Sequence, residues 1–323
     1  MKAALYRTTG PAAEVIRLEE VERPEPGPGE VRVRLRLSGV NPTDWKARTG
    51  ATPRPIQGFQ IPHHDGAGEI DALGEGVPAE RLGERVWVWL AAAGQPWGTA
   101  AQWTVVPAAQ ATQLPPGASY ELGACLGVPA LTAHRCLFAD GPVSGRDVLI
   151  TGGAGAVGHF AIELARWSGA RVAATVSGEA KAELARRAGA ELVVNYRESG
   201  AQAELQRFSS RFARIVEVNL AANLQMDLGL AGPETVVVVY AADVDDPVLP
   251  VRACMGANLV MRFVLLYGVA RPVLEEAAAV VCRALADSAL TELPIVRFPL
   301  DRCAEAQEAV RSGATGKVVL EIP

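Results

Sequence analysis

The segment from residue 147 to residue 241 limits the fold most, because short apolar runs alternate there with amphipathic ones. The apolar runs are residues 147–151, 171–177, 191–195, 214–219 and 235–241, and helical patterns lie at 156–169 and 179–189. Short runs of this kind suit strands that are buried on both faces, and helices between them connect parallel neighbours. The segment therefore predicts an α/β unit whose parallel sheet is covered on both faces.

The first 122 residues have a different texture, with short β-like runs separated by glycine- and proline-rich turns. In the run 31–37, valine and leucine alternate with Arg32, Arg34 and Arg36, which is the period of a half-buried strand. We interpret the arginine row as a solvated face rather than a phosphate-binding stripe. This spacing predicts an antiparallel, barrel-like unit. The tail adds expected strands at 294–300 and 316–322 and a helix at about 301–311.

The stretch "TGGAGAVGHF", residues 151–160, joins a predicted buried strand to a predicted helix. It contains the spacing Gly153-x-Gly155-x-x-Gly158, in which the first glycine permits a tight turn and the second lets phosphates approach the backbone. The third lets the helix pack closely on the strand. Backbone N–H groups and the helix dipole then converge on one point. The stretch predicts a pyrophosphate site, and a strand–helix turn without a ligand is the weaker alternative.

The residues after the second strand bear on the choice of dinucleotide. An NAD site normally has an acid there to bind the ribose 2′-hydroxyl, but this run ends on Ser177 and Gly178, and Glu179 already begins the next helix. Ser177 offers a hydroxyl and Lys181 a cation, which favours a 2′-phosphate and therefore NADPH. The alternative is that Lys181 is a solvated helix residue.

Composition excludes several classes of function. The net charge of −5 gives no overall attraction for nucleic acid or anionic membranes, and no apolar run approaches the ~20 residues of a membrane span. The cysteines are scattered, at positions 125, 136, 254, 282 and 303, which is typical of reduced core thiols rather than disulfides or a zinc knuckle. With no secretory signal pattern at the start, we expect a cytoplasmic protein.

Taken together, these stretches resemble a known family along nearly the whole chain. The residues that carry the resemblance are "GVNPTDW", "DGAGEIDALGEGVPAERLGERVWV", "GTAAQW", "GVPALTAH", the glycine turn, "RIVEVNLAANL", "VVVVYA" and "SGATGKVVLEI". The chain is similar to the zinc-independent medium-chain dehydrogenase/reductases, above all the quinone oxidoreductases of the ζ-crystallin type. The resemblance implies a GroES-like β-barrel domain at 1–122, completed by 265–323, and a Rossmann domain at 123–264, with the cofactor in the cleft.

The resemblance also implies the residues that bind NADPH. Ser177, Lys181 and Tyr196 would surround the adenosine 2′-phosphate, and the backbone from Ala154 through Gly155 and Ala156 to Val157 would meet the pyrophosphate. Along the nicotinamide end would lie Tyr240, Ala241, Phe263 and Leu265. Lys317 would approach the cofactor from the barrel domain.

By the same resemblance, zinc is not expected. The metal-dependent relatives have a cysteine where this chain has Asn41, and a second ligand near Val128, so His64 is the one ligand position retained. Without a metal to polarise a carbonyl, reduction of an already electrophilic conjugated acceptor is favoured over alcohol oxidation. Asn41 is the first candidate for hydrogen bonding to the acceptor, and the other catalytic candidates are His63, His64 and Lys46.

The predicted function is therefore zinc-independent reduction of a quinone by NADPH. Trp45 and Lys46 stand where many quinone reductases have tyrosines, so an enoyl or enone reductase is an open alternative. A zinc alcohol dehydrogenase and a non-catalytic role, crystallin-like or RNA-binding, are further alternatives, although the acidic charge argues against RNA. The apolar run 257–268 is a candidate edge strand for a homodimer. Single-electron transfer and hydride transfer are both open for this reduction.

Overall fold

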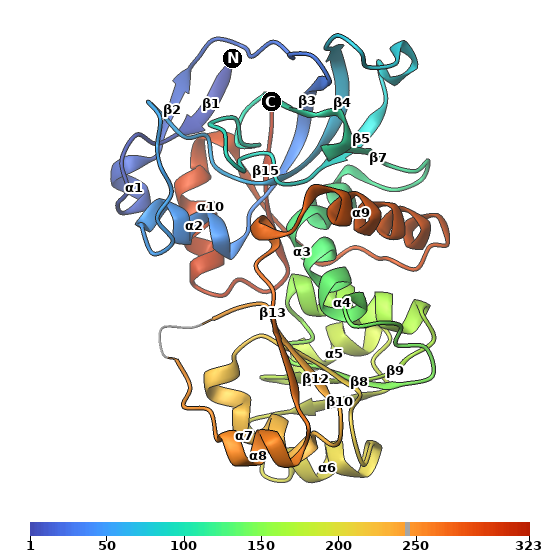
Figure 1. The fold of residues 1–323 in the computed structure, drawn as a ribbon. Coiled ribbons are helices and arrows are strands. Elements are labelled where there is room, and N and C mark those ends of the chain that lie inside the picture. The colour runs from blue at the N-terminus through green and yellow to red at the C-terminus, as the bar shows by residue number, and fades with distance from the viewer. Residues whose placement is uncertain (243–245) are drawn as a thin grey trace. The chain divides into compact units, whose positions relative to one another are not determined.

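The computed structural model describes residues 1–242 and 246–323, which form two compact units (Figure 1). The first unit, here called the β-rich unit, contains residues 1–128, 271–286 and 292–323. The second, the α/β unit, contains residues 129–270 and 287–291. The first boundary falls inside helix α3 (Tyr120–Phe138), a continuous helix that the sequence analysis did not predict.

The α/β unit is built on a parallel sheet, as predicted. Its described strands are β8 (Asp147–Ile150), β9 (Arg171–Val176), β10 (Leu192–Asn195), β11 (Arg214–Glu217), β12 (Val236–Val239) and β13 (Val260–Phe263). They lie in the order β10-β9-β8-β11-β12-β13, and every neighbouring pair is parallel. The chain starts in the middle of the sheet and adds strands outward in both directions, which is the doubly wound Rossmann arrangement.

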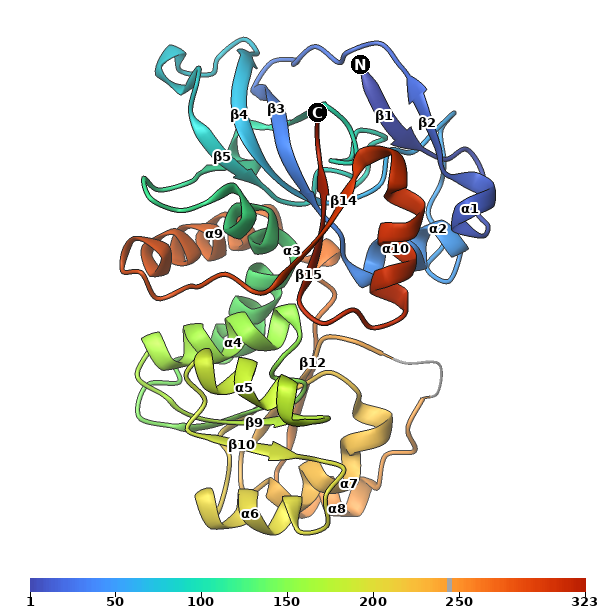
Figure 2. The same ribbon diagram turned by 180° about the vertical axis from the view of Figure 1, so that it is seen from behind.

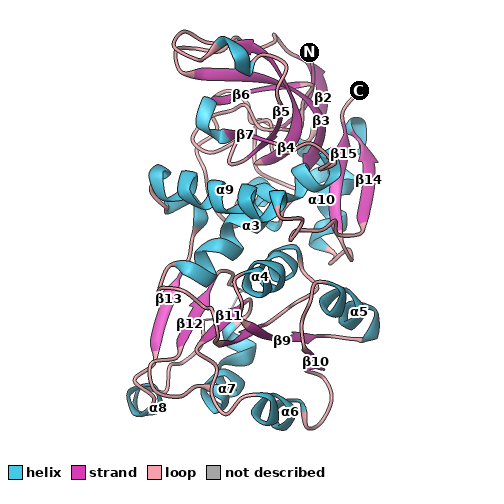
Figure 3. Ribbon diagram, turned by 90° about the vertical axis from the view of Figure 1, so that its right-hand side faces the viewer, coloured by secondary structure: helices cyan, strands magenta, loops and turns pink. Residues whose placement is uncertain are grey.

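Helices cover both faces of this sheet. Helices α4 (Ala156–Trp167) and α5 (Glu179–Arg187) lie on one face, and α6 (Ala201–Phe208), α7 (Leu220–Leu230) and α8 (Val251–Gly256) on the other (Figure 3). Phe160 and Leu164, which lie on one face of α4, are fully buried, and so is Ile162 on the other side of the helix. The strands beneath are correspondingly apolar, and Leu149 is fully buried. The alternating texture of the sequence thus reflects a sheet with no solvated face.

The β-rich unit is mainly antiparallel. A two-stranded sheet joins β1 (Lys2–Leu5) to β2 (Arg17–Glu20). The larger sheet contains β3 (Glu30–Gly39), β4 (Asp65–Leu73), β5 (Arg85–Val88), β6 (Trp103–Pro107), β7 (Ala111–Gln113), β14 (Ile295–Pro299) and β15 (Lys317–Glu321). Strand β3 lies at its centre and shifts register twice against β4. Such irregularities bend a sheet toward closure, in line with the predicted barrel.

The solvated interpretation of the arginine row was wrong for one residue. Arg34 and Arg36 are exposed, but Arg32 is only 6% exposed. Its guanidinium donates to Asp71 at 2.8 Å and to Glu25 at 2.6 Å. The alternating pattern on β3 could not show this, because the carboxylates that pair with Arg32 come from other segments.

Helices pack beside the barrel strands. Helices α1 (Ala12–Val15), α2 (Pro42–Thr49) and α10 (Cys303–Arg311) lie next to one another (Figure 2), and α9 (Arg271–Ala286) belongs to the same unit. Arg48 on α2 is fully buried and donates from Nε to Gln307 at 2.8 Å and from a terminal nitrogen to Glu308 at 2.7 Å. These bonds hold α2 against α10. Short 3-10 turns occur at Ala79–Arg81, Ala108–Gln110, Leu266–Gly268 and Leu300–Arg302. Within the described ranges, none of the helices has the length and apolarity needed to cross a bilayer.

Candidate functional site

Most of the residues expected to contact a dinucleotide stand directly after strands of the α/β unit. Ser177 follows β9, Tyr196 follows β10, Tyr240 follows β12, and Phe263 is the last residue of β13. Since these strands are parallel, the four residues lie at the same edge of the sheet, the carboxyl edge. The strand order reverses between β8 and β11, and open α/β sheets bind ligands at the carboxyl edge near such a reversal.

The glycine turn after β8 needs a correction. The residue with a left-handed backbone is Gly152, with φ +68°, and not Gly153, to which the tight turn was assigned. Gly153 is needed for space, because a Cβ there would lie 2.8 Å from the Cβ of Ala174 on β9. Gly158 has the predicted role: a Cβ at this position would lie 2.3 Å from the carbonyl oxygen of Gly152. Helix α4 therefore packs directly on the turn.

The N-terminus of α4 is free to receive an anion. Gly155 is its N-cap residue and is exposed, and no side chain of the described residues caps this end of the helix. The first turn begins with Ala156 and Val157, and Ala154 is buried just before the cap. Uncapped N–H groups and the positive end of the helix dipole suit a pyrophosphate. The turn thus has the features that a phosphate cradle requires.

Ser177, Lys181 and Tyr196 are brought together at the same edge. The Nζ of Lys181 lies 3.2 Å from the Oγ of Ser177, and the N–H of Tyr196 donates to the carbonyl of Val176 at 3.0 Å. Glu179, the nearest acid, is turned away, because its Oε1 accepts from Arg186 at 2.6 Å. The position where an NAD site has its acid therefore presents a hydroxyl and a cation.

The remaining dinucleotide candidates lie after the last two strands. Tyr240 and Ala241 are the first two residues after β12. Burial raises the pKa of the Tyr240 phenol. Phe263 and Leu265 are 67% and 70% exposed. They present apolar surface at the end of β13 and just beyond it, which is the type of surface that a planar ring covers well.

A pair of buried carboxyls beside the glycine turn was missed by the sequence analysis. Glu217 ends β11 and is fully buried, and Asp227 on α7 is 1% exposed. Glu217 accepts from Asn223 at 2.9 Å, and the N–H of the next residue, Val218, donates to Oγ1 of Thr151, the first residue of the turn, at 2.9 Å. Burial and the Glu217 charge raise the pKa of Asp227 to about 9, so Asp227 keeps its proton at neutral pH. The signal in the sequence was an acid inside the apolar run 214–219.

In the β-rich unit, Asn41 stands between β3 and α2. Its backbone is extended, with φ −124° and ψ 159°, as predicted for a residue before proline. Its backbone N–H donates to Asp44 at 2.7 Å, its Nδ2 donates to Asp65 at 2.6 Å, and its Oδ1 accepts from Lys317 at 2.6 Å. Asn41 is thus the centre of a buried polar cluster.

The acids of this cluster have raised pKa values. Asp44 is 3% exposed, and its burial, with a smaller contribution from the Asp65 charge, raises its pKa to about 7. Burial also raises the pKa of Asp65, while Lys317 and Asn41 act in the opposite direction. The ammonium of Lys317 lies 3.6 Å from Asp65 and is itself 2% exposed. These contacts all lie inside the β-rich unit, and the expectation that Lys317 approaches the cofactor stays a prediction.

The two histidines face different partners. His63 is fully buried, and its Nδ1 lies 3.0 Å from Ser38 and its Nε2 3.3 Å from Gln307. Burial lowers its pKa to about 3, so the ring is neutral. It has a left-handed backbone with φ 74°, and the surrounding contacts hold it there. This environment makes His63 an interior residue.

Lys46 is a further catalytic candidate and lies on α2. Its ammonium is 5.8 Å from the ring centre of Trp45.

His64 does not present a free lone pair to a metal. Its Nε2 lies 2.9 Å from a terminal nitrogen of Arg54, and because a guanidinium has only donors, Nε2 is the acceptor. Burial, with Arg54 next, lowers the His64 pKa well below its usual value. The other two expected ligand positions are Asn41, whose amide is already bonded, and the aliphatic Val128. Within the described ranges, no three His, Cys, Asp or Glu residues gather as a metal group would. These residues do not fit a zinc ion.

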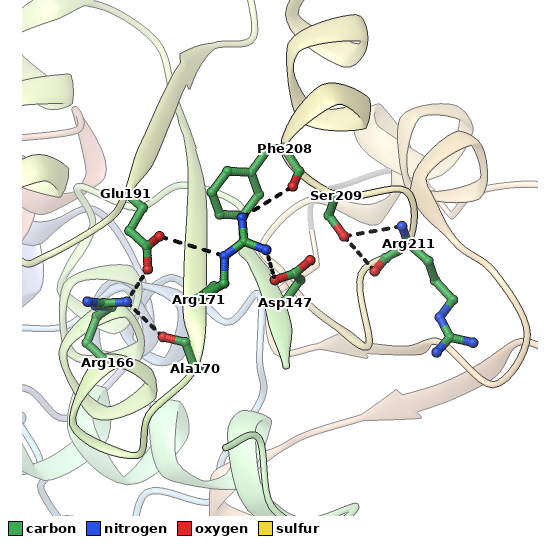
Figure 4. Close-up of polar contacts among 8 residues, drawn as sticks. All are labelled: Asp147, Arg166, Ala170, Arg171, Glu191, Phe208, Ser209 and Arg211. Carbon is green, nitrogen blue, oxygen red and sulfur yellow. Dashed lines mark hydrogen bonds and ion pairs between the residues drawn. The ribbon is translucent and has the colours of Figure 1, made fainter. Parts of the chain in front are cut away.

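Charged residues also cluster at the opposite edge of the α/β sheet (Figure 4). Arg171 and Asp147 are the first residues of β9 and β8 and pair at 3.0 Å. Glu191 pairs with both Arg171 and Arg166, and the Arg171 guanidinium lies 4.5 Å from the ring centre of Phe208. Exposed pairs of this kind contribute little each. They join the amino ends of the strands and lie away from the dinucleotide candidates.

Comparisons with known proteins match two parts of the chain and, in some relatives, nearly all of it. A family model described as an alcohol dehydrogenase GroES-like domain matches residues 27–116, and one described as a zinc-binding dehydrogenase matches residues 156–282. Quinone oxidoreductase from Homo sapiens is 28% identical over 315 residues, which cover 95% of this chain and 94% of that protein. Mycobacterial Rv1454c complexed with NADPH superposes with a TM-score of 0.87 at 26% identity, covering 99% and 100% of the two chains. An NAD-dependent alcohol dehydrogenase superposes with a TM-score of 0.90 at 24% identity over the whole of both chains, which shows the shared fold.

Proposed function

Since the chain belongs to the medium-chain dehydrogenase/reductases and is an NAD(P)-dependent oxidoreductase of the quinone oxidoreductase type, we propose that it reduces a quinone with NADPH and without zinc. The observation that supports NADPH as the cofactor is the pairing of Lys181 with Ser177 after β9, where an NAD site would have an acid. The similarity to a protein complexed with NADPH supports the same choice.

The α/β unit would bind the cofactor along its carboxyl edge. The N-terminus of α4 holds the pyrophosphate, Ser177, Lys181 and Tyr196 hold the 2′-phosphate, and the apolar surface at Phe263 and Leu265 receives the nicotinamide end. When bound, the reduced nicotinamide supplies a hydride, which is two electrons and one hydrogen nucleus. The remaining proton of the two-electron reduction comes from water.

In the β-rich unit, Asn41 would donate a hydrogen bond to the oxygen of the acceptor. A donor held in place stabilises the negative charge that develops on this oxygen when the ring or the conjugated double bond gains electrons. We expect Asn41→Ala to lower turnover about tenfold or more while NADPH binding changes less than twofold. Equal turnover in the variant and the parent would reduce Asn41 to a structural role.

The proposal is tested by measuring initial rates of NADPH and NADH oxidation with a panel of quinones and α,β-unsaturated ketones. We expect quinones to be reduced with a higher kcat/KM than enones, and NADPH to be preferred over NADH. Higher rates with enones would assign the chain to the alternative, an enoyl or enone reductase on the same fold. Binding of NADPH without turnover of any acceptor would contradict the enzymatic proposal.

Zinc independence rests on the Arg54–His64 bond. A divalent cation at Nε2 would have to displace a guanidinium and find further ligands among an amide and an aliphatic side chain. We expect elemental analysis of the purified protein to find far less than one zinc per chain, with rates unchanged by a chelator. About one zinc per chain, lost together with activity on chelation, would overturn this part.

We further propose a homodimer joined through β13, the last strand of the sheet. Its edge and the residues near it are apolar and exposed: Val260 is 43%, Met255 70% and Val251 63% exposed. An exposed parallel edge of this kind is suited to pairing with a second copy. Sedimentation should show a dimer for the parent and a monomer for Val260→Arg.

We also propose a cytoplasmic location. The five cysteines are free thiols, and three of them are buried, which suits a reducing compartment.

A further inference from the structure

We propose that Lys317 and Asp65 are positioning residues that fix the direction of the Asn41 side-chain amide, so that its second N–H is the group presented to the acceptor. This inference rests on the proposed role of Asn41 as a hydrogen-bond donor. It assigns Lys317 to the Asn41 amide, whereas the family resemblance implied a contact with the cofactor.

The first argument is the pattern of donors and acceptors. An amide has nearly the same shape when its oxygen and nitrogen are exchanged, so neighbours decide which way it faces. Lys317 offers only donors, and it lies 2.6 Å from Oδ1 of Asn41. Asp65 offers acceptors when ionised, and its Oδ2 lies 2.6 Å from Nδ2 of Asn41. The exchanged orientation would oppose donor to donor and acceptor to acceptor, so the charged pair permits one orientation.

The second argument is that Asp65 and the backbone of Asn41 are themselves held by further hydrogen bonds. The other oxygen of Asp65 accepts from the backbone N–H of Val128 at 2.8 Å, and the backbone N–H of Asn41 donates to Asp44 at 2.7 Å. Asn41 is therefore fixed at its backbone and at both atoms of its amide. The bonds to Lys317 and Asp65 use the amide oxygen and one amide hydrogen. The hydrogen that remains on Nδ2 is the one that can bind an acceptor oxygen, and a donor already in place needs no reorganisation during the reaction.

The third argument is burial. Asn41, Asp65 and Lys317 are 3%, 0% and 2% exposed, so the charges of Asp65 and Lys317 compensate one another away from water. Removal of one partner from a buried pair is strongly destabilising, because the other charge is left without compensation. A single substitution therefore confuses loss of fold with loss of function, and the test needs a variant that removes both charges.

The experiment compares the parent with Lys317→Met, Lys317→Arg and the double variant Asp65→Asn/Lys317→Met, with Lys2→Met as the control for an exposed lysine of the same unit. We expect Lys317→Met to lower both Tm and kcat, the latter about tenfold. The double variant should regain Tm but not kcat, and Lys317→Arg should regain part of kcat. The dissociation constant of NADPH should stay within twofold in every variant that folds.

A second measurement does not depend on turnover. In a ¹H–¹⁵N spectrum of the cofactor-free protein, the side-chain amide pair of Asn41, identified by its loss in Asn41→Asp, should be sharp in the parent. It should shift and broaden in the double variant and stay unchanged in Lys2→Met. An unchanged amide signal in the double variant would overturn the proposal, as would a kcat equal to that of the parent.

The outcomes separate this inference from the proposed function. An NADPH affinity that falls together with kcat in Lys317→Met would overturn the inference and return Lys317 to the cofactor. If the parent reduces no quinone or enone, the proposed function fails, and the amide spectrum still decides whether Lys317 and Asp65 hold Asn41.

Discussion

The Nζ of Lys181 on α5 lies 3.2 Å from the Oγ of Ser177, which stands four residues earlier, directly after β9. The two groups stand where the backbone leaves the sheet, and the nearest acid, Glu179, pairs instead with Arg186. A phosphate at this point would meet a cation and a hydroxyl that are already together. The first prediction follows from this arrangement.

Lys181→Ala should weaken NADPH binding about ten- to a hundredfold and leave NADH binding nearly unchanged. A charge-assisted hydrogen bond to phosphate contributes about 1.5 to 3 kcal/mol, at about 1.4 kcal/mol per tenfold, and NADH has no 2′-phosphate. Fluorescence titration of both cofactors measures the difference. Arg187→Ala, an exposed cation on the same helix, is the control. Equal weakening of both cofactors, or of neither, would make Lys181 an ordinary solvated residue.

Alanine substitutions at two glycines of the turn should affect folding stability and cofactor affinity separately. A Cβ at residue 158 would lie 2.3 Å from a backbone oxygen, so Gly158→Ala should lower the free energy of unfolding by about 1 to 3 kcal/mol. A Cβ at residue 155 would come no nearer than 3.3 Å to that oxygen. Gly155→Ala should therefore keep its Tm yet lose cofactor affinity, because the new methyl group stands where phosphates approach. Urea unfolding and NADPH titration check both, and a Tm loss in Gly155→Ala larger than in Gly158→Ala would contradict the assignment.

Asp44 should make stability depend on pH. In the folded chain it holds its proton up to about pH 7, whereas an unfolded aspartate releases its proton near pH ~3.9. Folding then takes up a proton between these values, so the stability of the parent falls as pH rises through this window. Asp44→Asn does not titrate and can still accept from the N–H of Asn41. Relative to this variant, the parent should lose up to about 4 kcal/mol between pH 4 and pH 7. Parallel stability curves for the two proteins would show that Asp44 is ionised throughout.

Asp227 gives a related prediction in the α/β unit, with a window that extends further. Its folded pKa of about 9 lies far above that of an unfolded aspartate, so its contribution to stability declines from about pH 4 upward and is lost above pH 9. Asp227→Asn supplies an amide N–H to Glu217 without requiring a proton. We expect the variant to be more stable than the parent at pH 8 and to have a smaller advantage at pH 5. Thermal unfolding at the two pH values checks this prediction. If the stability difference between the variant and the parent does not change with pH, Asp227 does not hold a proton in the folded chain over this range.

Much of the α/β unit could be predicted because its order is local. The apolar runs that became β8, β9, β10, β11 and β12, and the helical patterns that became α4 and α5, each carry their own signal. Parallel connections then force their carboxyl ends to one edge, so Ser177 and Tyr196 could be placed together without knowledge of any side-chain contact. The long helix α3 and helices α6 to α9 were missed, although α6 and α9 have amphipathic patterns of their own.

The sequence by itself determined the composition of the site: a glycine turn, no acid after β9, and an asparagine in place of a zinc ligand. Only the tertiary structure decided what these residues contact. Gly152 rather than Gly153 takes the left-handed turn, Arg54 bonds the histidine that a metal would need, and Lys317, 276 positions from Asn41, bonds its amide. Contacts of this kind depend on how strands and helices from distant segments pack, and a buried charge takes whichever partner that packing brings within reach.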